Sequence, residues 1–318
     1  MKTVVILSLL CLSIYAFNLE RQEEIVEKVN KLKTTWKATV YPRDIKTLIG
    51  VLPNGPKLPE KVFENSNDEL PESYDSRTAH PECDSIGEIR DQSKCGSCWA
   101  FGASEVMTDR LCLHSGGQIH TRLSPLHLVS CCTSCGFGCH GGTPAGAFLW
   151  WRDHGVPSGG LYGDKTTCKP YFLPECEDHM QKCHDYADTP KCENSCIPEY
   201  QKTVEEDLTF GKNAYSVNGE KNIMKEIMEN GPVEGAFNVY EDFGTYKEGI
   251  YQHVTGSLLG GHAIKIIGWG VSEDGVKYWL IANSWNTRWG ENGFFRMLRG
   301  NDECGIESSA VAGLPKLD

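Results

Sequence analysis

The chain has 318 residues, with 43 acidic and 31 basic side chains and a formal net charge of −12. Nucleic-acid binding depends on clustered Lys and Arg, and no such stripe occurs, so the composition argues against a nucleic-acid partner. The 15 cysteines are instead typical of a chain whose disulfides form in an oxidising compartment.

The first sixteen residues have the features of a secretory signal peptide. Lys2 precedes an apolar run that is too short to span a bilayer, and Ala16 is a small residue after which a signal peptidase could cut. A buried core helix is the alternative. We expect residues 1–16 to direct the chain into the secretory pathway. No later segment is long and apolar enough to cross a membrane, so no membrane partner is expected.

The segment from 17 to 69 differs in character from the rest of the chain. Its first apolar residues follow one face of a charged helix: Leu19, Ile25, Val26, Val29 and Leu32. Residues 51–62 are rich in Pro and Gly and are expected to be extended. An ordinary N-terminal subdomain is one interpretation, and a removable prosegment is the other.

The stretch QSKCGSCWAFG, Gln92 to Gly102, places a thiol at the start of a predicted helix. After Cys98, apolar residues recur at helical spacing: Trp99, Ala103, Val106, Met107 and Leu111. The N–H groups and the dipole at a helix N-terminus favour the thiolate, which is the nucleophilic form. A structural half-cystine and a redox pair with Cys95 remain alternatives. Two further helices are expected, one opened by Ser124 and Pro125 and one running from Thr143 to Gly155.

A nucleophilic cysteine needs a base, and the base needs an orienting partner. His262 precedes the β-branched and aromatic run Ala263 to Trp269, and Asn283 follows a similar run, Tyr278 to Ala282. Both residues are therefore expected on neighbouring strands of one sheet. A histidine that only fills the core is the alternative for His262.

Together these motifs resemble the papain family of cysteine proteases, and its cathepsin B branch most closely. CGSCW around Cys98, with His and Asn far downstream, is the local signature of the family, and the likeness runs from Leu70 to the C-terminus. Cys98 and His262 are 164 residues apart, against roughly 130 to 150 in the family. The extra length falls between Cys168 and Cys196, where cathepsin B carries a loop that partly closes its cleft.

The resemblance implies an α+β fold with two papain-like lobes, which suits one compact domain of this size. The left lobe is expected to be helical and to hold Cys98. The right lobe is expected to be a barrel-like sheet that holds His262 and Asn283, with the cleft between the lobes. Residues 17–69 would then be a propeptide that crosses the cleft in reverse, and residues 70–318 the peptidase domain.

The catalytic roles implied by the resemblance are those of a thiol protease. Cys98 and His262 would form a thiolate–imidazolium pair, with the thiol pKa lowered, and the thiolate would attack a peptide carbonyl. Gln92 and the backbone N–H of Cys98 would bind the oxyanion, and an acyl-enzyme would follow. Asn283 would orient the imidazole, and Trp285 would shield that hydrogen bond, although simple core packing is the alternative for Trp285.

Several positions are expected to bind substrate. Gly141 and Gly142 resemble the glycines along which the substrate backbone lies. Cathepsin B has a Glu at the base of the S2 pocket where this chain has Ser309, so we expect apolar P2 side chains against a wall containing Pro144 and Ala263.

The predicted closing loop, CEDHMQKC, departs from the cathepsin B pattern of two adjacent histidines. Asp178 stands where a latch histidine is expected, opposite Asp91, and like charges repel. His179 matches the position that binds the substrate carboxylate, with a solvated loop residue as the alternative, and His184 could substitute. The hypothesis is a weakly latched loop, and hence an endopeptidase with reduced removal of C-terminal dipeptides.

Similarity to cathepsin B also implies a disulfide pairing that leaves Cys304 over: Cys83–Cys112, Cys95–Cys139, Cys131–Cys192, Cys132–Cys135, Cys168–Cys196 and Cys176–Cys183. Zinc is the rival use for pairs such as Cys132 and Cys135. No metal or cofactor is expected. The resemblance implies peptide and protein substrates, the propeptide and cystatin-like proteins as inhibitors, a monomer, and a lysosome-like, digestive-vacuole or extracellular destination. A non-catalytic peptide-binding homologue and a disulfide-rich structural module are the other classes considered.

Overall fold

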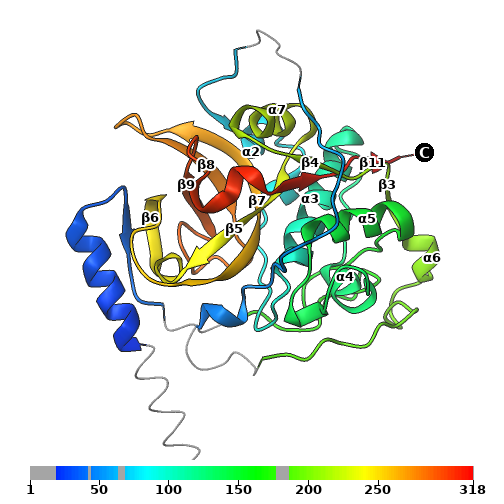
Figure 1. Ribbon diagram of the computed structural model, residues 1–318. Helices are drawn as coiled ribbons and strands as arrows, with labels where there is room; N and C mark the ends of the chain where they lie inside the picture. Colours follow the sequence, from blue (N-terminus) through cyan, green and yellow to red (C-terminus); the bar gives the residue numbers. More distant parts are fainter. Residues whose placement is uncertain (1–18, 42–43, 64–68, 177–185, 318) are drawn as a thin grey trace, which may run out of the picture.

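The computed structural model describes residues 19–41, 44–63, 69–176 and 186–317. A helical and a strand-rich part lie side by side, with α3, α4, α5 and α6 on the right of Figure 1. The helices are α2 (Ser76–Ala79), α3 (Cys98–His114), α4 (Pro125–Cys131), α5 (Pro144–His154), α6 (Val204–Asp207) and α7 (Glu220–Asn230), and the 3₁₀ turns are η1 (Ile45–Thr47), η2 (Asp84–Gly87), η3 (Gly138–His140), η4 (Glu241–Thr245) and η5 (Glu303–Ser308). No helix among the described residues is long and apolar enough to cross a membrane.

One nine-stranded sheet forms most of the strand-rich lobe. Its order is β1-β6-β9-β8-β7-β5-β10-β4, with β2 also paired to β7, while β3 and β11 form a separate pair. The strands are β1 (Trp36–Ala38), β2 (Tyr74–Asp75), β3 (Phe210–Gly211), β4 (Tyr215–Val217), β5 (Val233–Tyr240), β6 (Tyr246–Tyr251), β7 (Leu258–Val271), β8 (Lys277–Ala282), β9 (Phe294–Leu298), β10 (Ala310–Ala312) and β11 (Pro315–Lys316).

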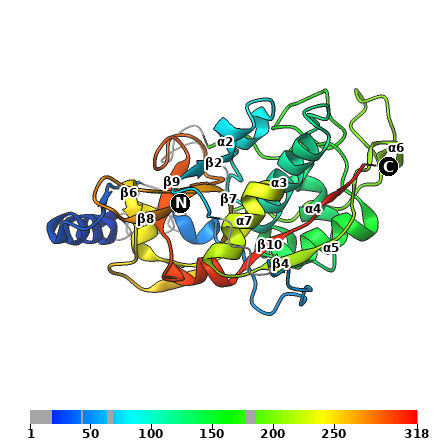
Figure 2. The same cartoon turned by 90° about the horizontal axis from the view of Figure 1, so that it is seen from above.

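Each lobe has its own hydrophobic core, and α3 lies between them. α3 is buried from Cys98 to Cys112 and packs against β7 and β5 on one side and against α4 and α5 on the other (Figure 2). Its apolar residues belong to the core of the helical lobe, and on the other side Asp109 pairs with Lys265 of β7 at 2.9 Å, so the helix joins the lobes. The predicted α+β fold with two papain-like lobes is therefore confirmed.

The expected helix boundaries follow local capping chemistry. The hydroxyl of Ser124 accepts the N–H of His127 at 3.0 Å, as an N-cap should, and Pro125 occupies the first turn of α4. Thr143 precedes α5 without a capping bond, because its hydroxyl donates to the carbonyl of Cys135 at 3.2 Å. α5 ends at Gly155, whose φ of 78° is accessible mainly to glycine.

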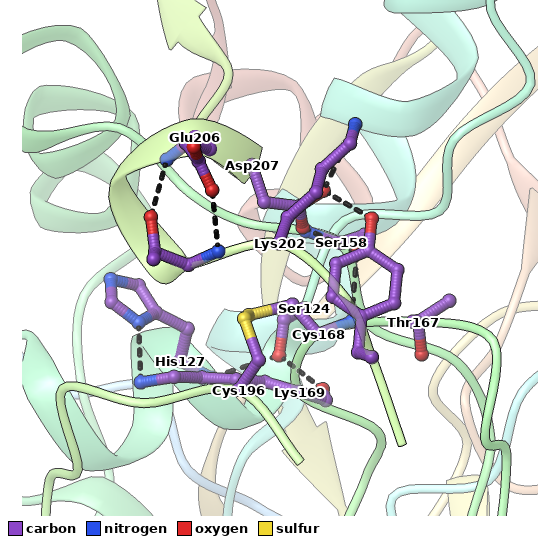
Figure 3. Close-up of a disulfide and its surroundings, with 12 residues drawn as sticks. Ser124, His127, Ser158, Thr167, Cys168, Lys169, Cys196, Lys202, Glu206 and Asp207 are labelled. Atoms are coloured by element: carbon purple, nitrogen blue, oxygen red, sulfur yellow. Dashed lines mark hydrogen bonds and ion pairs between the residues drawn. A yellow bond between two sulfur atoms is a disulfide. The ribbon is translucent and has the colours of Figure 1, made fainter. Parts of the chain in front are cut away.

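The cysteine-rich part of the helical lobe is held by disulfides and buried polar contacts (Figure 3). Near Cys168–Cys196, Ser158 donates to Asp207 at 2.5 Å and accepts the backbone N–H of Cys168 at 2.9 Å. The structure forms five of the disulfides that the resemblance implies: Cys83–Cys112, Cys95–Cys139, Cys131–Cys192, Cys132–Cys135 and Cys168–Cys196. Cys183 lies outside the described residues, and Cys304 has no disulfide.

The N-terminal segment docks on the strand-rich lobe. Residues 19–32 are helical and lie at its outer edge, and β1 pairs with β6 (Figures 1 and 2). On the apolar face predicted for this helix, Ile25 and Val29 are buried, whereas Leu32 at the end of the helix is 55% exposed. Trp36 is buried against the rings of Tyr246 and Tyr251.

Trp36 anchors this segment more strongly than its surface charges do. Truncation of a buried Phe or Trp typically costs about 3–5 kcal/mol. The ion pair of Lys37 with Glu248 joins side chains that are 72% and 46% exposed, and such pairs contribute roughly 0–1 kcal/mol. The segment ends at a second contact, where the backbone of Lys61 donates to Ser216 at 2.8 Å and its ammonium lies 2.7 Å from buried Glu226.

Two buried carboxyl groups lie where α3 meets β5. Burial, and then the charge of neighbouring Glu105, raises the pKa of Glu234 well above its ordinary value. Burial also raises the pKa of Glu105 from 4.5 to about 7, although Lys265 and Arg90 act in the opposite direction. The folded protein therefore binds protons at pH values where the unfolded chain has released them.

We expect stability to fall as the pH rises, because these folded-state pKa values are raised. The contribution of Glu105 to the free energy of unfolding is fully present below pH 4.5. It is lost as the pH rises through about 7, and the loss is on the order of 3 kcal/mol. Urea unfolding between pH 4.5 and 7.5 measures it, and Glu234→Gln should flatten the dependence. The control is Glu229→Gln at an exposed site. A wild-type stability that does not fall over this range contradicts the prediction.

Candidate active site

Cys98 begins α3 and is fully buried at the junction of the two lobes. Its sulfur accepts backbone hydrogen bonds from Ala263 of β7 and from Gly50 of the N-terminal segment. The first contact brings the thiol beside His262, the residue before Ala263. The helix start predicted from the sequence is thus the observed one, and the strand of the predicted base lies against it.

His262 lies on β7, and Asn283 directly follows the neighbouring strand β8 and not, as predicted, within it. β7 pairs with β8 in antiparallel register, with Lys265 opposite Ala282, so Asn283 directly follows the paired region. His262 Nε2 lies 2.8 Å from Asn283 Oδ1, and the backbone N–H of Ser284 donates to the same Oδ1 at 2.9 Å. An atom that accepts an N–H is the amide oxygen, so Nε2 carries the imidazole hydrogen and Nδ1 is the nitrogen that can exchange a proton.

Trp285 covers the histidine. The two ring centroids are 4.7 Å apart, and both side chains are fully buried. Trp285 also packs on Phe243 and Trp289, so it belongs to the core of the strand-rich lobe and to the site. The two roles weighed from the sequence are compatible.

Gln92 directs its amide group at the N-terminal segment. Its Nε2 donates to the carbonyl oxygen of Leu48 at 2.9 Å and to that of Cys95 at 2.8 Å. Its Oε1 accepts the hydroxyl of Ser284 at 2.8 Å, which fixes the amide so that its N–H groups point toward Leu48. Sequence reasoning missed Ser284, and its place directly after Asn283 was the available clue.

The N-terminal segment runs through the site as extended backbone. Val51 forms a parallel bridge with Gly142 and an antiparallel bridge with Gly261. The N–H of Gly142 donates to the carbonyl of Gly50 at 2.8 Å, and the carbonyl of Gly142 accepts the N–H of Leu52 at 2.9 Å. A Cβ added to Gly50 would lie 1.9 Å from the carbonyl oxygen of Gly96, so only glycine fits there.

The acidity of the Cys98 thiol reflects its burial. Burial raises the pKa of the Cys98 thiol from 9.0 to about 12, and backbone hydrogen bonds from Ala263 and Gly50 offset only part of that increase. The sequence predicts a lowered pKa for the thiolate–imidazolium pair. The pKa of the thiol is raised and not lowered because the buried sulfur is shielded from the water that would solvate a thiolate.

A cavity of about 420 Å³ lies beside this extended segment. Its lining includes the predicted residues Pro144 and Ser309 together with Ala236, and the N-terminal segment contributes Leu52 and Leu58. Ala263 lies at the Cys98 thiol and not at this cavity. Gly141, with a φ of 109°, has Leu52 beside it.

The predicted closing-loop residues Asp178, His179 and His184 lie outside the described residues. The base of that loop is described. Asp91 accepts the backbone N–H of Cys176 and the side-chain amide of Asn286, both at 2.9 Å. In the described part of the chain, no group of three or more His, Cys, Asp or Glu side chains is arranged to hold a metal ion.

Comparisons with known proteins agree with this geometry. The family model described as "Papain family cysteine protease" matches residues 70–314. Cathepsin B-like cysteine proteinase 6 of Caenorhabditis elegans is 48% identical over 93% of this chain and 84% of its own length. The cathepsin B-like cysteine proteinase of Schistosoma japonicum is 54% identical over 79% of this chain and 75% of its own length.

Solved structures extend the match to the N-terminal segment. The structure named proCathepsin B S9 from Trypanosoma congolense is 38% identical, with a TM-score of 0.81, over 93% of this chain and 98% of that chain. Digestive procathepsin L 3 of Tenebrio molitor shares the fold at 23% identity, with a TM-score of 0.69, over 95% of this chain and 90% of that chain. The chain therefore belongs to the papain family of cysteine proteases, as a cathepsin B-like peptidase made as a proenzyme.

Proposed function

We propose that Cys98 is the nucleophile, His262 its base, Asn283 the orienting residue and Gln92 an oxyanion donor. The observation that carries this assignment is the junction of the lobes, where the Cys98 sulfur accepts the N–H of Ala263 and the neighbouring His262 is held by Asn283 at 2.8 Å. With Nε2 committed to Asn283, the His262 ring receives the thiol proton at Nδ1.

Hydrolysis then follows from these groups. The Cys98 thiolate attacks the substrate carbonyl, and the negative charge that develops on its oxygen is stabilised by Gln92 Nε2 and the backbone N–H of Cys98. His262 gives its proton to the leaving amine, and water hydrolyses the resulting acyl-enzyme. Ser284 supports the step by holding the Gln92 amide in place at 2.8 Å.

Residues 17–69 act in this proposal as the propeptide and inhibitor, residues 1–16 as the signal peptide and residues 70–318 as the peptidase domain. The inhibitory role is supported by the Leu48 carbonyl at Gln92 and by Gly50 at the thiol, since both occupy places that a substrate needs. Passage through the secretory pathway to a lysosome-like or extracellular destination is supported by the five disulfides.

The predominantly endopeptidase activity rests on Asp178 at the latch position. Asp91, its expected partner, instead holds the base of the loop through Cys176 and Asn286. A second carboxylate brought to that site would meet negative charge.

The matured protein, incubated at mildly acidic pH with a peptide that has a free C-terminus, should make internal cuts detectable by mass spectrometry. Cys98→Ala should make none. Cleavage by the Cys98→Ala variant would overturn the assignment of the nucleophile. Stepwise loss of C-terminal dipeptides as the main reaction would overturn only the endopeptidase proposal.

At the S2 cavity, the proposed preference is for apolar P2 side chains, because Ser309 offers no carboxylate to a P2 Arg. Matched substrates with Phe or Arg at P2 should differ in kcat/KM by about tenfold or more in favour of Phe. Ser309→Glu should raise the Arg value, whereas the uncharged control Ser309→Gln should not. Faster turnover of the Arg substrate by the wild type contradicts the preference.

The propeptide contact at Gly50 makes the inhibitory role testable. Gly50→Ala places a methyl group against the Gly96 carbonyl, and overpacking of this kind typically costs about 1–3 kcal/mol. In the uncleaved proenzyme, Cys98 should then react with an active-site-directed epoxide about tenfold faster, as followed by peptide mass mapping. Gly87→Ala is the control, since its methyl group makes only ordinary contact, at 3.6 Å, with Arg77. Equal rates in all three proteins would exclude this role for Gly50.

A further inference from the structure

β4 is the last strand of the nine-stranded sheet, and the N-terminal segment lies along its outer edge. Ser216 of β4 donates its N–H to the carbonyl of Pro59 at 3.0 Å and accepts the N–H of Lys61 at 2.8 Å. These two bonds form a parallel bridge between Glu60 and Ser216. An edge strand offers N–H and C=O groups with which an extended chain can pair, and here a segment of the same chain does so.

The side chain of Lys61 places its charge on a buried carboxylate of α7. Its ammonium lies 2.7 Å from Glu226 Oε2 and 5.2 Å from the ring centroid of Tyr215 in β4. The Glu226 side chain is fully buried, whereas that of Lys61 is 32% exposed. Hydrogen bonds between charged groups are stronger than neutral ones, and an aromatic face adds attraction for a cation. The strand edge and the carboxylate together form a site for an extended chain that carries a lysine.

Residues of the peptidase domain hold Glu226 in place independently of Lys61. Arg110 of α3 lies 2.9 Å from Glu226 Oε1, and the Tyr215 hydroxyl donates to the same oxygen at 2.5 Å. Asn230 donates to Oε2 at 3.1 Å. Burial raises the pKa of Glu226, but the charge of Arg110 and the hydrogen bond from Lys61 outweigh it, so the pKa lies below its ordinary value. The group is therefore a carboxylate at mildly acidic pH, with Oε2 directed at the position of the ammonium.

The edge of β4 adjoins the cavity beside the cleft. Glu60 and Ser216 both belong to the lining of that cavity of about 420 Å³. Leu52, which pairs with Gly142 in the cleft, and Lys61 are nine residues apart in the sequence. One polypeptide can therefore occupy the cleft and the edge of β4 at the same time, as the N-terminal segment does.

Maturation would free this site. Under the proposed function residues 17–69 are removed, so the carbonyl of Pro59 and both the N–H and the ammonium of Lys61 leave together. The backbone groups of Ser216 and the carboxylate of Glu226 then become available to another chain. A partner that restores all three contacts needs an extended backbone with a cationic side chain at the matching place.

We propose that the matured peptidase binds protein substrates at an exosite formed by Tyr215, Ser216 and Glu226. The exosite takes an extended segment of the substrate that presents a lysine side chain. Its occupation raises the effective concentration of the scissile bond at the cleft. Because the contact is the same in the ground state and the transition state, it lowers KM and leaves kcat unchanged. The proposal rests on the proposed removal of residues 17–69 and on the proposed role of Cys98.

The first test measures the binding of a labelled peptide, LPEKVF, the sequence of residues 58–63, by fluorescence anisotropy. The protein is matured, loss of the N-terminal segment is confirmed by intact mass, and the cleft is blocked with an active-site-directed epoxide. Norleucine in place of the lysine should weaken binding by about tenfold or more, because the charge-assisted hydrogen bond is lost. Glu226→Gln should weaken binding of the lysine peptide to a similar extent. The control is Glu229→Gln, at an exposed position of the same helix.

The second test measures the cleavage of two substrates that share one scissile sequence and differ only in an upstream segment. One carries LPEKVF and the other its norleucine analogue, each joined through a flexible linker. The lysine substrate should have a KM about fivefold to tenfold lower, with kcat within about twofold. Glu226→Gln should remove the difference in KM, and so should an excess of free LPEKVF peptide.

Equal affinity of the wild type for the lysine and norleucine peptides overturns the proposal, and this comparison needs no protein variant. A loss of affinity in Glu229→Gln as large as in Glu226→Gln overturns the assignment to Glu226. Equal KM values for the two substrates overturn the role in substrate binding. Absence of any Cys98-dependent cleavage, or retention of the N-terminal segment by the active protein, would instead contradict the proposed function itself.

Discussion

The packing of the first turn of α3 against β7 is the contact on which the rest of the site depends. It puts the Cys98 sulfur on the backbone N–H of Ala263 and therefore beside His262. α3 begins 164 residues before His262, and it links the core of the helical lobe to β7. Neither lobe contains a complete site by itself, so the chemistry exists only when the two cores form and meet.

The N-terminal segment contacts the Gln92 amide and the Cys98 sulfur, and in its proposed inhibitory role it keeps substrate from both. Geometrically, the carbonyl of Leu48 accepts a hydrogen bond from the Gln92 amide. Gly50 packs so closely against the Gly96 carbonyl that no side chain fits there. Electrostatically, burial raises the pKa of Cys98 to about 12, so the thiol stays protonated. The Gly50 N–H at the sulfur itself lowers the thiol pKa, so the increase comes from the burial of the whole site.

The sequence predicts what local chemistry decides. The start of α3 at Cys98 and the cap at Ser124 follow from residues within a few positions, and the strands beside His262 follow from β-branched runs. The buried carboxyl of Glu234 could not be predicted, because its burial depends on tertiary packing, whereas the only clue to Ser284 was its place directly after Asn283.

The N-terminal segment is held at two separated places, by buried Trp36 at β6 and by Lys61 at Glu226. A cut in the chain between 63 and 70 breaks neither contact. The segment then changes from a tethered part of the molecule into a separate ligand whose occupancy depends on its own concentration. After the cut, the concentration of the released segment would decide how much of the protein has an open cleft. A compartment that holds the protein at high concentration would therefore keep cut molecules closed for longer than a dilute one.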